Sequence, residues 1–364
     1  MKVLHVESGR HLYGGAKQVL YIMEGLARRG VTNLLACPPG AHIAAPARAC
    51  AQVFELPMKG DADLGLALRL TRLIQAERPD LVHLHSRRGA DLWGGVAAKL
   101  AGVPCVLSRR VDNPEARWVV GLKYRLYDHV ITISEGIRQV LLSEGLAADR
   151  VSCVRSAVDA APYLRDYDKA GFRASLGLPT DTPLAGMVAQ LIPRKGHRHL
   201  LAALQNVLPR HPVLQVLVFG RGPLEAELRQ AIADQGLAGN VRLMGFVDNL
   251  PEILGGLDLL VHPADMEGLG VSLLQASAAR VPIIASRAGG MPEAVRDGVN
   301  GLLIAPGDVA ALAAAMNRLL DDAALRTRMG EAGRALVLDE FSVEAMCEGN
   351  LAIYRKVLQG RGKT

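Results

Sequence analysis

The sequence predicts an α/β protein built from two doubly wound, Rossmann-like domains that face a central cleft. Short apolar runs rich in Val, Ile and Leu alternate with longer stretches of helical period along most of the chain. The runs contain few polar residues, which indicates strands buried on both faces and therefore parallel sheets. The alternation weakens over residues 158–183 and then starts again, which indicates two domains in series.

The first half begins with an expected strand, KVLHV, which a glycine-rich turn joins to a helix. In that helix Val19, Ile22, Met23 and Leu26 share one face, and Gly30 marks the end. The later expected elements are a strand at 80–85, a helix at 91–102, strands at 103–108 and 129–134, and a helix at 135–145.

We place the domain boundary near residue 163, because Pro, Gly, Asp and Tyr interrupt the rhythm there. The second half repeats the alternation, with expected strands at 183–189, 213–220, 241–246, 257–263, 281–286 and 301–306. The predicted parts are therefore 1–163, 164–341 and a last helix in 342–364 that crosses back to the first domain. Ligands of such sheets bind at the carboxyl ends of the strands.

Size and composition exclude several classes of protein. The 364 residues are 50% apolar and 21% charged, and no apolar run is long enough to span a membrane. The five cysteines have no metal-site spacing and the start lacks a signal peptide, so we expect reduced thiols and a cytoplasmic location. Aromatic residues make up only 4%, which argues against a nucleic-acid partner.

The net charge of +6 lies in the first half, where residues 1–163 hold 21 basic and 15 acidic residues. Arg87, Arg88, Arg109 and Arg110 supply part of this excess. Such a face attracts phosphate groups or an anionic membrane surface. An ordinary solvated surface is an equally good interpretation.

Glycine-rich turns follow several expected strands and begin helices, at Gly14–Gly15, Gly220–Gly222 and Gly289–Gly290. Glycine lets a ligand approach the backbone, and a helix N-terminus favours a phosphate, although each turn alone is a weak signal. Arg194 and Lys195 follow the first strand of the second half and have the chemistry to clamp a diphosphate. Taken alone, they fit a solvated basic loop better.

His83 and His85 lie on the same side of one expected strand, because side chains alternate along a strand. His85 is nearest the carboxyl end, where the ligand is expected. A metal pair is chemically reasonable, but the sequence shows no third ligand beside it. His83 is expected to be a packed core residue.

Together these motifs resemble a known family, the retaining glycosyltransferases of family 4, which have the GT-B fold. The resemblance rests on seven segments in order: 13–20, 80–86, 187–201, 218–229, 241–254, 262–286 and 288–313. It extends over nearly the whole chain, and the ordered set is specific although each piece alone is weak.

In that family a Glu, seven residues and a second Glu span the donor loop and its helix. The resemblance gives Glu267 a contact with the donor sugar and places Gln275 where the ribose hydroxyls are held. The loop that would offer backbone N–H groups to the sugar and β-phosphate consists of Gly268, Leu269, Gly270 and Val271. Gln275 replaces the second Glu, so we expect a weaker or altered ribose contact.

The resemblance also assigns roles in the reaction. Lys195 and Arg194 would stabilise the departing diphosphate, and His85 would line the cleft near the reacting sugar. Gln190 stands where the family often has an Arg, and Arg194 is a candidate for that charge. Further donor-binding positions are Gly15, Gly222, Phe246 and Val247. No cofactor and no metal ion are expected besides a nucleotide sugar such as a UDP- or GDP-sugar.

We therefore expect a retaining, metal-independent glycosyltransferase that acts on a cell-envelope glycan or glycolipid, such as a lipopolysaccharide core or a capsule. The expected acceptor-binding residues are Arg87, Arg88, Arg109 and Arg110. The same basic face would contact the anionic inner face of the cytoplasmic membrane. Two alternatives remain open: a non-catalytic nucleotide- or glycan-binding relative, and a nucleotide-sugar epimerase of the same fold.

Overall fold

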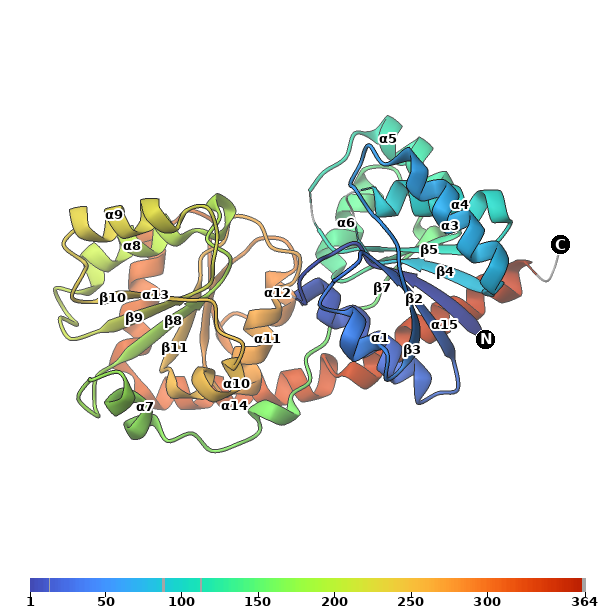
Figure 1. Cartoon of the computed structure of the whole chain (residues 1–364). Helices are drawn as coiled ribbons and strands as arrows, with labels where there is room; N and C mark the ends of the chain where they lie inside the picture. Colours follow the sequence, from blue (N-terminus) through green and yellow to red (C-terminus); the bar gives the residue numbers. More distant parts are fainter. Residues whose placement is uncertain (13, 87–88, 112, 362–364) are drawn as a thin grey trace. The chain divides into compact units, whose positions relative to one another are not determined.

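Each half of the chain forms one parallel sheet with helices on both faces (Figure 1). The computed structural model describes residues 1–12, 14–86, 89–111 and 113–361. Unit 1 consists of Met1–Ala157 and Val343–Thr364, and unit 2 of Val158–Ser342. The division thus lies slightly before the predicted boundary at residue 163, and the last helix groups with unit 1.

Unit 1 contains a seven-stranded sheet in the order β3-β2-β1-β4-β5-β6-β7. Its neighbouring strands pair in parallel. The strands are β1 (Lys2–Val6), β2 (Thr32–Cys37), β3 (Ala51–Glu55), β4 (Leu81–Leu84), β5 (Cys105–Arg109), β6 (His129–Thr132) and β7 (Val151–Cys153). The helices are α1 (Gly14–Ala27), α2 (Ala44–Ala47), α3 (Leu64–Glu77), α4 (Ala90–Ala101), α5 (Arg117–Lys123), α6 (Glu135–Ser143) and α15 (Val343–Arg361).

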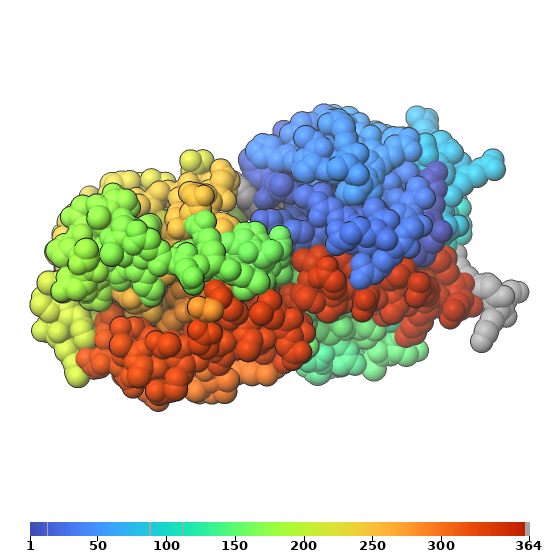
Figure 2. Space-filling model, turned by 90° about the horizontal axis from the view of Figure 1, so that it is seen from below, coloured from blue at the N-terminus to red at the C-terminus, as the bar shows by residue number. Residues whose placement is uncertain are grey.

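The alternation of side chains along β1 supplies two separate cores in unit 1. Val3 packs on one face of the sheet with Ile22 of α1 and Tyr354 of α15. Leu4 packs on the other face with Leu66 of α3. Figure 2 shows α15 in red along the blue N-terminal segments of the same unit. This apolar contact explains why the last helix belongs to unit 1.

Unit 2 contains a six-stranded parallel sheet in the order β10-β9-β8-β11-β12-β13. The strands are β8 (Leu184–Val188), β9 (Gln215–Phe219), β10 (Val241–Gly245), β11 (Leu259–His262), β12 (Ile283–Ser286) and β13 (Gly301–Ile304). The helices are α7 (Lys169–Ser175), α8 (His197–Val207), α9 (Glu225–Asp234), α10 (Leu250–Ile253), α11 (Val271–Ala278), α12 (Met291–Ala294), α13 (Val309–Asp321) and α14 (Ala323–Glu340).

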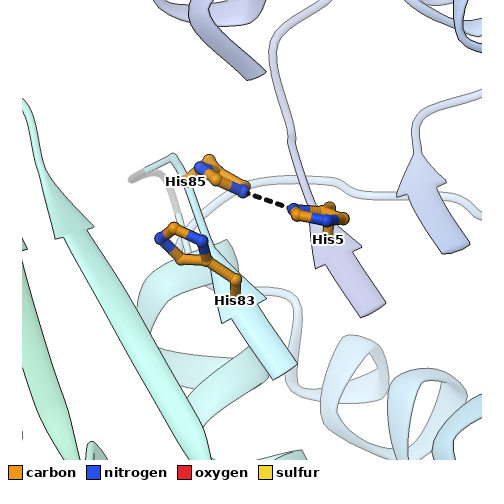
Figure 3. Close-up of side chains that lie close together, drawn as sticks. All are labelled: His5, His83 and His85. Atoms are coloured by element: carbon orange, nitrogen blue, oxygen red, sulfur yellow. Dashed lines mark hydrogen bonds between the residues drawn. The ribbon is translucent and has the colours of Figure 1, made fainter. Parts of the chain in front are cut away.

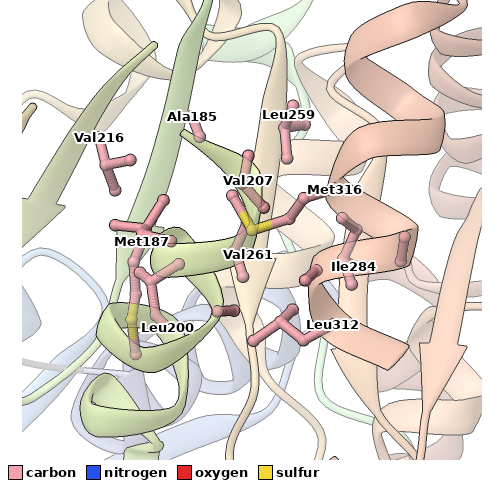
Figure 4. Close-up of a cluster of buried hydrophobic side chains, with 14 of the residues drawn as sticks. Ala185, Met187, Leu200, Val207, Val216, Leu259, Val261, Ile284, Leu312 and Met316 are labelled. Atoms are coloured by element: carbon pink, nitrogen blue, oxygen red, sulfur yellow. The ribbon is translucent and has the colours of Figure 1, made fainter. Parts of the chain in front are cut away.

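The main core of unit 2 lies between its sheet and the helices α8 and α13 (Figure 4). Met187 of β8 and Ile284 of β12 are fully buried against Leu200 of α8 and Met316 of α13. The apolar strands predicted from the sequence are therefore buried by helices, as a doubly wound sheet requires. Among the described residues, no helix combines the length and apolarity that crossing a membrane requires.

Both sheets have a point at which the strand order reverses. In unit 1 this point lies between β1 and β4, and in unit 2 between β8 and β11. The loops at the carboxyl ends of these strands diverge and leave room for a ligand. The loops that follow these four strands are therefore the expected places for a functional site.

Candidate functional site

A buried ionic cluster occupies the reversal point of unit 2. Lys195 ends the short 3-10 helix that follows β8, and Glu267 lies in the loop between β11 and α11. The Lys195 ammonium donates to Glu267 Oε2. His262, the last residue of β11, lies with its Nε2 3.1 Å from the same oxygen. The structure thus joins two residues predicted as catalytic, Lys195 and Glu267, and adds His262.

The surroundings of Glu267 keep its carboxylate ionised. Burial alone would raise its pKa, but the hydrogen bond from His262 and the charge of Lys195 outweigh burial and hold the pKa well below its usual range. Glu267 Oε1 also accepts from the N–H of Gly268 at 3.1 Å. Near neutral pH the cluster therefore presents an anion and a cation side by side.

Close backbone contacts hold the two loops of this cluster together. Gly196 has a left-handed φ of +74°, and a Cβ built there would lie 1.9 Å from the carbonyl oxygen of Pro263. The N–H of Asp265 donates to the carbonyl oxygen of Arg194 at 2.9 Å. Only glycine fits at residue 196, and this requirement fixes Lys195 and Glu267 relative to each other.

The donor loop predicted from the sequence leads directly into α11. Gly270 is the N-cap of α11, has a left-handed φ of +88°, and no side chain caps the helix there. The first N–H groups of a helix lack intrahelical partners and favour a negative charge. Leu269 is 1% exposed, so neither its side chain nor its backbone is open to solvent in the structure. Val271 and Gln275 are half-buried on α11.

A third loop of unit 2, after β9, packs against the first. A Cβ on Gly222 would lie 2.4 Å from the carbonyl oxygen of Leu191, so this glycine is required for packing. Phe246, directly after β10, is half-buried together with Val247. The guanidinium of Arg221 lies 5.6 Å from the centre of the Phe246 ring, a cation–π geometry that the sequence did not reveal.

Three buried histidines occupy the reversal point of unit 1 (Figure 3). His5 of β1 and His83 of β4 are direct partners in the parallel register, and His85 follows β4. His5 Nδ1 lies 2.9 Å from His85 Nε2. His83 is bonded on both sides, by Tyr354 Oη at 2.5 Å and Ser108 Oγ at 2.8 Å, and is the core residue the sequence predicts.

The structure supplies the third imidazole that the sequence did not reveal. One nitrogen from each of His5, His83 and His85 lies within 4.8 Å of the others, close enough for one metal ion. Burial, followed by the neighbouring imidazoles and Arg110, lowers the pKa of His85 well below its usual value, so the ring is neutral near pH 7. His85 is 1% exposed, so its imidazole is not open to solvent.

The four arginines predicted to bind an acceptor have different surroundings. Arg87 and Arg88 lie outside the described residues. Arg109 is 3% exposed, and its guanidinium bonds Glu115 at 2.9 Å and Tyr124 Oη at 3.2 Å. The Arg109 guanidinium is therefore a structural group that an acceptor does not reach, which corrects the prediction at this position.

Arg110 lies at the carboxyl edge of the first sheet, beside the glycine turn that begins α1. A Cβ built on Gly15 would lie 3.8 Å from Arg110 Cδ, whereas one on Gly14 meets nothing within 4 Å. Arg110 is half-buried, and its Nε donates to the carbonyl oxygen of His85 at 3.3 Å. The structure therefore brings together Gly15, His85 and Arg110 from the predicted set.

Sequence reasoning also missed His197 beside the ionic cluster of unit 2. It is 4% exposed, and neither ring nitrogen has a hydrogen-bond partner among the described residues. Burial, and then the charges of His262 and Lys195, lower its pKa to about 4. The sequence did contain a signal for His262. It is a histidine at the carboxyl end of an apolar run, as His85 is at the end of β4.

A separate cavity of about 380 Å³ lies at the opposite edge of the second sheet. Its lining includes Arg165, Asp258, Arg280 and Arg334. Asp258 directly precedes β11, so the cavity opens at the amino ends of the strands. Ligands of doubly wound sheets bind at the carboxyl ends, and the ionic cluster is therefore the better candidate site.

Comparison with protein families gives matches for both halves of the chain. The model described as "Glycosyl transferases group 1" matches residues 168–336. The model described as "Glycosyltransferase Family 4" matches residues 13–161. The first match contains the ionic cluster and α11, and the second contains Gly15, His85 and Arg110.

Individual relatives match over most of their length. A 2-deoxystreptamine glucosyltransferase from Streptomyces kanamyceticus is 32% identical over 324 residues, 80% of this chain and 82% of that protein. The lipopolysaccharide core biosynthesis glycosyltransferase LpsE of Rhizobium meliloti is 27% identical over 358 residues, 97% and 98% of the two chains. The crystal structure of Anabaena HepE in complex with UDP-glucose has a TM-score of 0.86 at 21% identity and covers 98% of this chain and 100% of that one.

Proposed function

The chain belongs to the group 1 glycosyltransferases and has the GT-B fold, and from that premise we propose a specific reaction. The protein moves a sugar from a nucleoside-diphosphate sugar to a cell-envelope glycan or lipid-linked acceptor, with retention of the anomeric configuration. The ionic cluster Lys195–Glu267–His262 carries this proposal, because it combines a cation for the diphosphate with a carboxylate for sugar hydroxyls.

The donor would bind across the cluster and the start of α11. The diphosphate would take the Lys195 ammonium, Arg194 and the free N–H groups of α11, where a fixed positive charge already exists. Glu267 would then exchange its contact with Lys195 for sugar hydroxyls. Phe246 and Arg221 lie at the same edge of the sheet and would border the nucleobase.

Catalysis would depend on stabilising the departing diphosphate. Negative charge grows on the leaving phosphate as the sugar–oxygen bond breaks, and preorganised cations and N–H groups lower that barrier most effectively. Gly196 and the loop contacts hold the backbone of Lys195 in place, so its ammonium has only to exchange the Glu267 carboxylate for the diphosphate. The leaving phosphate would accept the acceptor's proton on the same face of the sugar, so no protein nucleophile is assigned. This arrangement needs no divalent metal and no cofactor.

The acceptor would bind in unit 1, on the cytoplasmic side of the membrane. Arg110 lies at the carboxyl edge beside Gly15, where it would bind a phosphate of the acceptor. Arg87 and Arg88, which lie outside the described residues, are the other proposed acceptor-binding residues. LpsE, whose name assigns it to lipopolysaccharide core biosynthesis, matches nearly the whole chain and supports an envelope acceptor. Contact of this basic face with anionic lipid is part of the same proposal.

The test is a transfer assay with UDP- and GDP-sugars and a panel of core oligosaccharides and lipid-linked glycans. We expect nucleoside diphosphate release that depends on an acceptor, is unaffected by EDTA, and gives a product whose anomeric proton coupling matches the donor's. A new nucleotide sugar formed without acceptor would indicate an epimerase. Nucleotide binding without any turnover would indicate a non-catalytic relative.

A further inference from the structure

A series of hydrogen bonds connects Asn33 on β2 with Arg110 through two buried imidazoles of unit 1. Figure 3 shows its central bond, between His5 and His85. Asn33 Oδ1 lies 3.2 Å from His5 Nε2, and His5 Nδ1 lies 2.9 Å from His85 Nε2. His85 Nδ1 lies 3.5 Å from Arg110 Nη2. Asn33, His5 and His85 are at most 3% exposed.

The orientation of Asn33 assigns the protons along this chain. Its Nδ2 donates to the carbonyl oxygens of Met23 at 2.8 Å and Cys50 at 3.1 Å, so its Oδ1 faces His5 and can only accept. Burial lowers the pKa of His5 to about 4, so the ring is neutral and carries one proton. That proton lies on Nε2, and the Nδ1 of His5 is therefore an acceptor.

The position of the ring proton on His85 follows from that on His5. Since His5 Nδ1 accepts, the nitrogen that faces it, His85 Nε2, must donate. The Nδ1 of a neutral His85 is then a lone pair, and it faces the Arg110 guanidinium, which can only donate. Every contact in the chain has one donor and one acceptor with this assignment.

We propose that Asn33 and His5 are positioning residues that hold His85 in the neutral Nε2–H form, and that His85 in turn holds Arg110 at the carboxyl edge of the first sheet. Two atoms of His85 receive the guanidinium: the carbonyl oxygen takes Nε at 3.3 Å and Nδ1 takes Nη2 at 3.5 Å. The effect on sugar transfer rests on the proposed function, whereas the assignment of protons does not.

The same geometry argues against a metal ion between the three imidazoles. A metal bound to His85 Nε2 would move the ring proton to Nδ1, because a metal ligand needs the lone pair. That N–H would then face Arg110 Nη2 at 3.5 Å, so two donors would meet in a buried place. A metal site would therefore require Arg110 to leave.

Protonation of His85 would have the same consequence. Among the described residues, the titratable and charged groups that act on His85 are His83 of β4, His5 of β1 and Arg110, and Glu7 after β1 and Tyr354 of α15 act in turn on Arg110. An imidazolium beside Arg110 places two positive charges at hydrogen-bond distance, so protonation of His85 should release Arg110.

The direct test is ¹⁵N–¹H NMR of the full chain labelled with ¹⁵N-histidine, at pH 7.5. His5→Gln and His85→Gln assign the two signals. We expect the Nε2–H tautomer at both residues and no change with one equivalent of zinc. An Nδ1–H tautomer or an imidazolium at His85, or a joint shift of the imidazole signals with zinc, would overturn the proposal.

The kinetic test asks whether His5 acts through Arg110. His5→Leu should lower kcat/KM on the order of tenfold to a hundredfold and shift the acid limb of its pH profile, whereas His5→Gln, which keeps a donor and an acceptor, should restore most of it. Tyr354→Phe is the matched control, because it removes a buried hydrogen bond to His83, which is not part of the series from Asn33 to Arg110.

A double variant separates positioning from a general loss of structure. If His5 acts through Arg110, then His5→Leu with Arg110→Met should be no slower than Arg110→Met alone. The positioning role would be overturned if the two substitutions lowered kcat/KM by the product of their separate effects. It would also be overturned if Tyr354→Phe lowered kcat/KM as much as His5→Leu does. If the wild type transfers no sugar at all, the proposed function fails, and the NMR result still decides the assignment of protons.

Discussion

Replacing Lys195 with Met should destabilise unit 2 by leaving a buried carboxylate without its cation. The side chains of Lys195 and Glu267 are 10% and 18% exposed. Breaking a pair as buried as this one costs about 3–5 kcal/mol. Glu267 keeps His262 and the N–H of Gly268, each at 3.1 Å, so we expect the lower end of that range, about 3 kcal/mol.

Scanning calorimetry at pH 7 measures this loss. For a unit of this size, 1 kcal/mol corresponds to roughly 2–4 °C, so Lys195→Met should melt about 6–12 °C below the wild type. The double variant with Glu267→Gln should recover part of the loss, because no buried charge is then unpaired. A melting temperature of Lys195→Met within about 1 °C of the wild type would refute the reasoning. A double variant whose loss of stability equals the sum of the two single losses would refute it as well.

The pH at which this pair stabilises unit 2 follows from Glu267. Its folded pKa lies well below the usual range, because the hydrogen bond from His262 and the charge of Lys195 outweigh burial. The stabilisation is therefore complete above the unfolded pKa, about 4.3, and is lost as the pH falls below it. Calorimetry of the wild type and Lys195→Met at pH 7 therefore measures the full stabilisation by the ion pair.

Three other substitutions or conditions test separate parts of the structure. Gly196→Ala should cost at least about 2 kcal/mol in urea unfolding, whereas Gly236→Ala, with a similar φ of +69° and open space around it, should cost less; equal losses would contradict the contact. Arg109→Met should destabilise the protein by about 1.5–3 kcal/mol, because Glu115 loses one buried cation although it keeps the Lys123 ammonium at 3.2 Å and the Tyr124 hydroxyl at 3.0 Å, and an unchanged melting temperature would place that arginine on a free surface. The folded pKa of His5 is about 4, so the contribution of His5 to stability should be constant above about pH 6.5 and fall by roughly 3 kcal/mol towards pH 4. A His5→Leu variant should therefore lose less stability than the wild type over this range, and an identical pH dependence would show that other groups cause the whole fall.

The sequence was informative where local pattern decides structure. Apolar runs without alternation predicted buried parallel strands, and β8 and β11 confirm this with fully buried apolar residues. The family motifs led to Lys195 and Glu267, whose pairing the structure shows directly. These features depend on residues close together in the chain or on an ordered set of motifs.

The register between strands that are distant in the sequence could not be predicted from the sequence. His5 and His83 become neighbours only because β1 pairs with β4 in one particular register, and no local pattern specifies that choice. Arg109 and Arg110 illustrate a second limit. Adjacent residues at a strand end point to opposite sides, and here one reaches Glu115 inside the unit while the other reaches His85 at the edge.

The central claim is that the Lys195–Glu267 cluster binds the diphosphate of a nucleotide sugar. Thermal unfolding with UDP, GDP, ADP and CMP, each added to wild type, Lys195→Met and Lys169→Met, tests it most directly. One nucleoside diphosphate at about 100 times its Kd should add roughly 2.7 kcal/mol, a shift of several degrees, in the wild type. Lys169, at the amino edge beside Asp258, should not affect this shift, whereas Lys195→Met should abolish it. An absent shift in the wild type, or an undiminished one in Lys195→Met, would contradict the account.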